Sequence, residues 1–284
     1  MAKKRKFTLT RTKADWAKNR EGLLVGEPVK SNEAYAERKS KELQRQVAKL
    51  QKDINKAVNG LIGTAGVLAT TGEAKATFTK LLDDYTKKFN LLSSTFSNDM
   101  VSNIDKQVTR DLGRSLKDLS GGLTIKTDSI SNVTKNIISA SVDQSTTLIR
   151  SIPQDYITEV REIVMRTFGS PSGDFQNTVK EIDKLLDTRY KKYKNKAKNL
   201  VLDQTRKAYA GISDQRMREV GVTNYRWKHA GGSVNPRPYH KNVLDGKVFS
   251  LDDPPIINPS TGERGHPGDA INCKCYKIPV VELG

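Results

Sequence analysis

The chain has 284 residues, with 49 Lys and Arg against 32 Asp and Glu, so its formal net charge is +17. This length allows one large domain or two modest ones, and the charge excess indicates a polyanionic partner. Only 36% of the residues are hydrophobic and 6% aromatic, which fits an elongated, helix-rich molecule better than a compact enzyme. The sequence has no run of about 18 apolar residues, which excludes a membrane-spanning helix. The basic N-terminus lacks the apolar segment of a secretory signal, so we expect a reducing compartment and free thiols.

Two segments carry the whole charge excess. Residues 1–52 hold 15 basic and 6 acidic side chains, residues 180–228 hold 14 and 6, and the rest of the chain is balanced. Such clustering favours local contacts with phosphate groups, although a solvated helix face remains an alternative for the second segment. The predicted DNA contacts are Lys3, Lys4, Arg5, Lys6, Arg11 and Lys13 in the first segment, and Arg189, Lys191, Lys192, Lys194, Lys196 and Lys198 in the second.

The chain up to residue 221 is predicted to be a basic tail followed by helices. Residues 1–30 show little periodicity and are expected to be flexible or extended. A helix is predicted from Ser31 or Asn32 to about Leu61, and its apolar seam would pack on another helix, more readily within the subunit than between subunits. That seam consists of Leu43, Val47, Leu50, Ile54, Ala57 and Leu61.

Further helical windows are expected between residues 73 and 168, divided at Gly113, at Gly121-Gly122 and at Pro153. A β or loop segment is an alternative for 124–147. A last helix runs through the second basic segment and ends at Gly221.

From residue 222 the pattern changes to that of a small β-rich unit. Residues 223–229 alternate in character as a strand does, and seven of the ten prolines lie between Pro236 and Pro279, which excludes long helices. Asp245-Gly246 predicts a hairpin or tight turn. The last predicted strand is Ile271–Val280, with Cys273 and Cys275 on one face.

All three histidines and both cysteines lie within the 47 residues from His229 to Cys275. A structural Zn²⁺ needs about four thiolate and imidazole ligands, and it stabilises small units that have little core. The candidate ligands are His240, Cys273 and Cys275, with His266 or Asp269 as the fourth. The alternative is a pair of buried apolar thiols beside a hydrogen-bonded core histidine.

The same region resembles the Mu-F-type phage head morphogenesis family, the minor head proteins. Eight ordered elements over about 80 residues carry the resemblance. They are Leu202-Asp203-Gln204-Thr205-Arg206, Gly221, Tyr225-Arg226-Trp227, Arg237-Pro238-Tyr239-His240, Leu244-Asp245-Gly246-Lys247-Val248-Phe249, Gly265-His266-Pro267-Gly268-Asp269, Asn272-Cys273-Lys274-Cys275 and Pro279-Val280. Weaker helical similarity extends back to about residue 130, and residues 1–125 show none. Lys274 departs from the Arg expected in most members.

The resemblance implies a minor capsid protein that joins the head next to the portal and touches packaged DNA, influencing its retention or exit. Its partners would be the portal protein, a major capsid or scaffold protein and double-stranded DNA bound without sequence preference. Its location would be the capsid interior or portal vertex, and the host cytoplasm during assembly. The motif residues carried over are Trp227, Arg237, His240, Asp245, Gly246, Asn272, Cys273 and Cys275.

Two other classes of protein compete with this interpretation. His229, Arg237, His240, Asp245 and Asp269 could form a metal-dependent nuclease or transferase site. No Gly-rich phosphate loop, Ser/His/Asp arrangement or His-Glu-x-x-His motif supports an enzyme, so Arg237 and His240 are expected to brace the Asp245-Gly246 turn instead. A cellular protein that binds DNA without specificity is the other alternative.

The predicted fold class is α+β, a mainly helical body with a small β-rich C-terminal unit. Its expected regions are a basic flexible tail (1–30), an unassigned helical region (31–125), the helical region of the head morphogenesis domain (126–221) and the β-rich unit (222–284).

Overall fold

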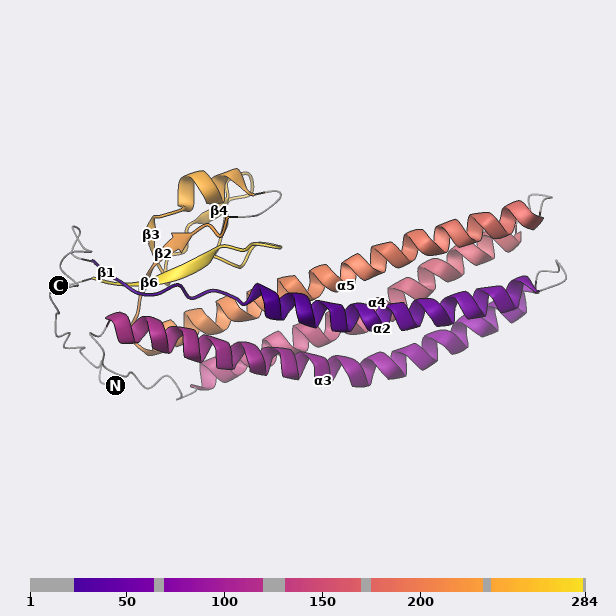
Figure 1. The fold of residues 1–284 in the computed structure, drawn as a ribbon, viewed down its shortest axis with the longest axis horizontal. Helices are drawn as coiled ribbons and strands as arrows, with labels where there is room; N and C mark the ends of the chain where they lie inside the picture. The colour runs from indigo at the N-terminus through magenta and orange to yellow at the C-terminus, as the bar shows by residue number, and fades with distance from the viewer. Residues whose placement is uncertain (1–22, 64–68, 120–130, 170–174, 232–235, 283–284) are drawn as a thin grey trace. The chain divides into compact units, whose positions relative to one another are not determined.

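The computed structural model describes residues 23–63, 69–119, 131–169, 175–231 and 236–282. Most of these residues form long helices, and a small antiparallel sheet gathers near the C-terminus (Figure 1). The helices are α2 (Glu33–Ile62), α3 (Thr71–Leu119), α4 (Asn132–Gly169) and α5 (Phe175–Glu219), with a short π-helix η1 (His240–Leu244). The strands are β1 (Leu23–Val25), β2 (Asn224–Lys228), β3 (Val248–Ser250), β4 (Ile256–Asn258), β5 (Glu263–Arg264) and β6 (Tyr276–Glu282). The predicted α+β class is confirmed. None of the described helices is long and apolar enough to cross a membrane.

The chain forms two compact units, and each is assembled from separate stretches of sequence. The bundle unit comprises residues 33–99 and 142–202, and the sheet unit comprises residues 1–32, 100–141 and 203–284. Helices α3, α4 and α5 contribute residues to both units.

The bundle unit packs parts of α2, α3, α4 and α5 around an apolar core. Leu43, Val47, Leu50 and Ile54 of α2 have no exposed surface, as the predicted seam requires. Val58 rather than Ala57 takes the next buried position, because a straight helix drifts relative to a strict heptad. The seam packs within the chain: Tyr85 of α3 donates a hydrogen bond of 2.7 Å to Asp53 of α2.

Two predicted helix breaks are wrong. Gly113 lies inside α3 and Pro153 lies inside α4, although glycine costs a helix about 1 kcal/mol and proline about 3. The buried faces around them outweigh that cost. Leu112 and Leu116 are buried beside Gly113, and Ile152 is buried beside Pro153. Residues 132–147 are helical too, which corrects the alternative of a β or loop segment there, and Gly121-Gly122 lies outside the described residues.

The sheet unit contains a four-stranded antiparallel sheet in the order β1-β6-β2-β3 and a separate pair, β4-β5. The central strand β2 buries Tyr225 and Trp227, as the alternation predicted. Strand β1 pairs with β6 at the edge, and the Val29 N–H donates to the Lys277 carbonyl at 2.9 Å. Residues 23–30, expected to belong to a flexible tail, are therefore ordered by backbone pairing with the far end of the chain.

The predicted stop of the last helix is confirmed. Gly221 has a φ of 83°, which favours glycine. The Gly221 N–H donates to the Arg218 carbonyl, and the Val222 N–H to the Met217 carbonyl, the two bonds of a Schellman motif. Strand β2 begins three residues after this turn, at Asn224.

One predicted feature of the C-terminal region is confirmed and another differs. Asp245-Gly246 forms the predicted tight turn, with a φ of 83° at Gly246, and the segment before it is the π-helix η1. The last strand begins only at Tyr276. Asn272 has a φ of 57°, a left-handed conformation that ends strand geometry. Both cysteines therefore precede the strand, with Cys273 closing a turn through its N–H bond to the Ala270 carbonyl.

Candidate functional site

The sheet unit gathers three potential metal ligands from separate elements. His240 opens η1, and Cys273 and Cys275 lie in the segment before β6. The His240 Nδ1 lies 3.6 Å from the Cys273 Sγ and 3.7 Å from the Cys275 Sγ. The ligand atoms of the three residues all lie within 4.8 Å of one another, and all three side chains are buried. Among the described residues no other group of three or more His, Cys, Asp or Glu is so arranged.

The hydrogen bond of the second ring nitrogen of His240 fixes the tautomer of the imidazole. The Nε2 atom lies 3.1 Å from the Ile257 carbonyl oxygen, and a carbonyl oxygen only accepts, so Nε2 carries the hydrogen. In the neutral ring Nδ1 then presents its lone pair to the two sulfurs. A carbonyl that orients a histidine in this way is the usual outer partner of a metal-bound imidazole.

The two thiols share a strongly asymmetric environment. The hydrogen bond from the Cys275 thiol holds the pKa of Cys273 well below its usual range despite burial, and the backbone N–H groups of Gly268 and Cys275 act in the same direction. The bond to Cys273 and burial raise the pKa of Cys275, against the opposite effects of the Trp227 indole and the Ala230 N–H. These contacts therefore favour the thiolate form of Cys273 and the thiol form of Cys275.

Trp227 closes one side of this cluster. Its ring meets that of His240 edge-on, with 5.2 Å between the ring centroids. The indole has no exposed surface. Its N–H makes no hydrogen bond of ordinary geometry within the described part of the chain, although it favours negative charge on the Cys275 sulfur.

The remaining predicted ligands lie elsewhere. The His266 Nδ1 is 3.0 Å from the Tyr225 hydroxyl, and the Asp269 carboxylate accepts from the His266 backbone N–H at 2.7 Å. The structure thus brings together three of the four predicted metal ligands and does not bring His266 or Asp269 to them.

The other motif residues support the loops around the cluster. Asp245 accepts from the His229 N–H at 2.8 Å, Arg237 donates to the Ile271 carbonyl at 2.8 Å, and the Asn272 N–H donates to Asp203 of α5 at 2.8 Å. Arg237 and His240 therefore brace the segments at Ile271 and Ile257 rather than the Asp245-Gly246 turn. Within the described ranges, His229, His240, Asp245 and Asp269 of the alternative enzyme site do not form a group of three or more neighbouring ligand atoms.

A buried charge network adjoins the cluster, and sequence reasoning missed it. Lys277 is only 2% exposed; its Nζ lies 2.7 Å from Asp214 of α5 and donates to the Pro267 carbonyl at 3.1 Å. Burial lowers the pKa of His266, against the attraction of Asp214. A lysine at a core-facing position of an apolar strand was the signal that could have indicated this network.

The predicted DNA contacts of the second basic segment lie on α5 in the bundle unit, where most of these cations are already paired. Lys192 and Arg189 contact Glu159 at 2.5 and 3.4 Å, and Lys196 contacts Asp155 at 2.6 Å. Two more ion pairs are Lys191–Asp187 at 2.6 Å and Lys198–Glu37 at 3.2 Å. Lys194 instead lies over the Tyr190 ring at 5.5 Å. Lys3, Lys4, Arg5, Lys6, Arg11 and Lys13 lie outside the described residues.

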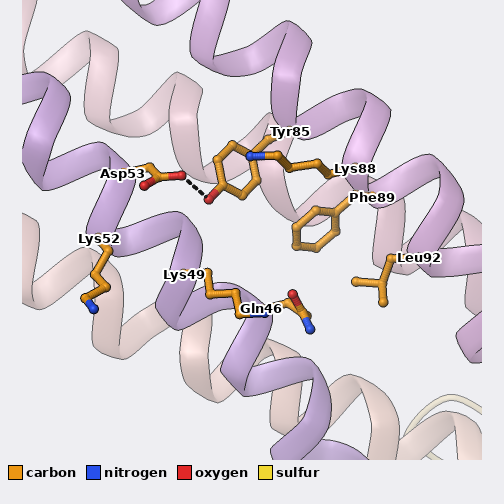
Figure 2. Close-up of a pocket in the computed structure, with 8 residues that line it drawn as sticks. All are labelled: Gln46, Lys49, Lys52, Asp53, Tyr85, Lys88, Phe89 and Leu92. Carbon is orange, nitrogen blue, oxygen red and sulfur yellow. Dashed lines mark hydrogen bonds between the residues drawn. The ribbon is translucent and has the colours of Figure 1, made fainter.

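A second basic surface lies between α2 and α3 in the bundle unit (Figure 2). Lys49, Lys52 and Lys88 line a pocket around the hydrogen bond from Tyr85 to Asp53. The Lys88 Nζ lies 4.4 Å from the centre of the Tyr85 ring. The sequence did not single out these lysines, because they come from two different helices.

The end of α5, the sheet and the cysteine–histidine cluster together define an α+β domain held on a long helix. Residues 159–278 match the model of the family described as Phage Mu protein F like protein. The match lies in the region whose motifs resemble the Mu-F-type phage head morphogenesis family, so the predicted resemblance is confirmed. Over 208 residues, 72% of the chain, the sequence is 27% identical to an uncharacterized protein of Haemophilus influenzae (strain ATCC 51907 / DSM 11121 / KW20 / Rd). The chain spans 43% of that relative's length. No solved structure matches the chain.

Proposed function

We propose that this protein is a minor capsid component of a tailed phage, incorporated beside the portal during head assembly and in contact with packaged DNA. The observation that carries the proposal is the family match over residues 159–278, because it spans all of α5 and the C-terminal part of the sheet unit as far as residue 278. Its proposed partners are the portal protein, a major capsid or scaffold protein, and double-stranded DNA. Its proposed sites are the capsid interior or portal vertex and, during assembly, the host cytoplasm.

The charge distribution supports the DNA contact. The chain carries +17, and duplex DNA presents a negative charge every 1.7 Å or so along its axis. The ion pairs of the second basic segment do not prevent such contact, because exposed pairs contribute only about 0–1 kcal/mol each. A phosphate can therefore replace a carboxylate partner at small cost.

Composition analysis of purified particles tests the assembly role. We expect the protein in mature virions at a small fraction of the copies of the major capsid protein. A nonsense mutation in its gene should give heads that assemble or retain DNA poorly, and expression of the full chain in trans should restore them. Virions that lack the protein, with unchanged heads in the mutant, would rule out the proposal.

Salt-dependent binding to duplex DNA tests the nucleic-acid contact separately. The test variant replaces Lys191, Lys192, Lys194 and Lys196 with Gln. The matched control removes the same charge from exposed lysines of the same unit, by replacing Lys75, Lys80, Lys87 and Lys184 with Gln. Each lost phosphate contact should reduce the slope of log K against log salt by about 0.9. Equal slopes for the two variants would show that the second basic segment does not touch DNA, and replacing Lys3, Lys4, Arg5 and Lys6 tests the first segment in the same way.

A further inference from the structure

We propose that His240, Cys273 and Cys275 bind a structural Zn²⁺ ion inside the sheet unit. This inference does not depend on the proposed role in the phage head. It rests on the distances between the three ligand atoms, on the groups that orient them, and on the protection of the cluster from solvent.

The distances match those of a zinc tetrahedron. Zinc binds cysteine sulfur at about 2.3 Å and histidine nitrogen at about 2.0–2.1 Å. At a tetrahedral angle these bonds place a sulfur and a nitrogen ligand about 3.6 Å apart. The observed separations from the His240 Nδ1 are 3.6 Å to Cys273 and 3.7 Å to Cys275. Both nitrogen–sulfur separations thus have the length that a zinc site requires, and all three atoms lie within 4.8 Å of one another.

The lone pairs point toward the space between these atoms. The bond of Nε2 to the Ile257 carbonyl leaves the Nδ1 lone pair of His240 directed at the sulfurs. A packing role would require no such orientation, since an apolar thiol needs no acceptor or cation beside it.

The chemistry of the three side chains suits a metal ion. Cysteine sulfur and imidazole nitrogen are the ligands of structural zinc sites. Two buried sulfurs this close to one another can both be thiolates only where a cation lies between them. A divalent ion that prefers sulfur and nitrogen supplies that charge.

The setting suits a structural ion. His240 is 2% exposed, Cys273 4% and Cys275 9%. The cluster links η1 to the segment before β6, in a region whose regular elements are short. A region with so little core gains more stability from a bound ion than a domain with a large core does. Within the described residues the site has three protein ligands, and a water molecule would complete the tetrahedron.

Metal analysis of the full chain, purified without a histidine tag from zinc-supplemented cells, tests the proposal. We expect about one zinc per chain, lost in Cys273→Ser, Cys275→Ser and His240→Gln. The matched controls are His266→Gln and His229→Gln, which remove the other two histidines and should keep the zinc. Retention of zinc in all three ligand variants would overturn the assignment of the ligands.

A measurement on the unmodified chain covers the case in which the ligand variants do not fold. Cobalt substituted for zinc should give the intense visible bands of tetrahedral Co²⁺ and a thiolate-to-cobalt charge-transfer band. Both thiols should resist a thiol reagent until a chelator is added. Less than about a tenth of an equivalent of zinc with both thiols reactive, or bound copper in place of zinc, would overturn the proposal.

Discussion

Replacing Lys277 should destabilise the sheet unit by far more than replacing an ordinary surface lysine. In Lys277→Met the Asp214 carboxylate loses its partner at 2.7 Å while remaining buried. Removing one member of a buried ion pair costs about 3–5 kcal/mol, because the other charge stays in the interior without compensation. Burial already raises the pKa of Asp214, against the attraction of Lys277. Without the lysine that pKa rises further, so Asp214 can escape part of the penalty by taking up a proton.

Urea unfolding followed by Trp227 fluorescence measures this loss, in a Trp16→Phe background that leaves one indole. The cost of Lys277→Met should shrink as the pH falls, by up to 1.4 kcal/mol or so per pH unit while Asp214 is protonated in the variant. The double variant Asp214→Asn, Lys277→Met should recover much of the stability. Lys228→Met is the control, because the Lys228–Asp245 pair is partly exposed at 3.3 Å and should contribute no more than about 1 kcal/mol. Equal losses in the two single variants would refute the argument.

Three further changes test the packing of the sheet unit. His266→Gln should flatten the pH dependence of unfolding. Burial lowers the pKa of His266 against the attraction of Asp214, so in the wild type the unfolded chain takes up the proton first and stability falls as the pH drops below about 6.5. Urea midpoints at about pH 7.5 and 5.5 measure this, and an equal change of midpoint in the wild type and the variant would contradict it. Gly268→Ala should cost about 1–3 kcal/mol, since Gly268 has a φ of 103° and an added Cβ would lie 2.9 Å from the Ala210 Cβ; Gly262→Ala, with a positive φ but open space, separates the steric contribution from the backbone one. Tyr209→Phe should cost about 1.5–3 kcal/mol by removing the 2.8 Å hydrogen bond to buried Asp111, and a thermal unfolding midpoint unchanged from wild type would show that this bond contributes nothing.

Local periodicity correctly predicted the elements in which the spacing of apolar residues matches the face that is buried in the fold. The α2 seam and the alternation of β2 were both visible because each buried face follows the period of its own element. At Gly113 and Pro153 the local signal and the packing disagree, so the predicted helix breaks were wrong. Their intrinsic cost is local and visible, whereas the buried surface that compensates for it comes from other helices.

The cysteine–histidine cluster was predictable as a set but not as a geometry. Composition alone brought His240, Cys273 and Cys275 to attention, since all the histidines and cysteines share one short region. The sequence placed both His240 and His266 among the candidate ligands. Only the fold shows that one faces two sulfurs, while the other faces Tyr225 and Asp214.

The basic segment on α5 shows where charge counting from sequence fails. Along the sequence, the six predicted cations of this segment follow one another with no acidic residue between them. In the bundle unit five of them lie beside carboxylates, and three of those pairs use Glu159 or Asp155, which are 30 to 41 residues away in sequence. A phosphate that binds there must displace a carboxylate, so part of the Coulomb energy gained is lost again as repulsion from the displaced group. The contribution of this segment to DNA affinity should therefore be smaller than its charge suggests, and Lys194, which has an aromatic partner instead of an acidic one, should contribute the most per residue.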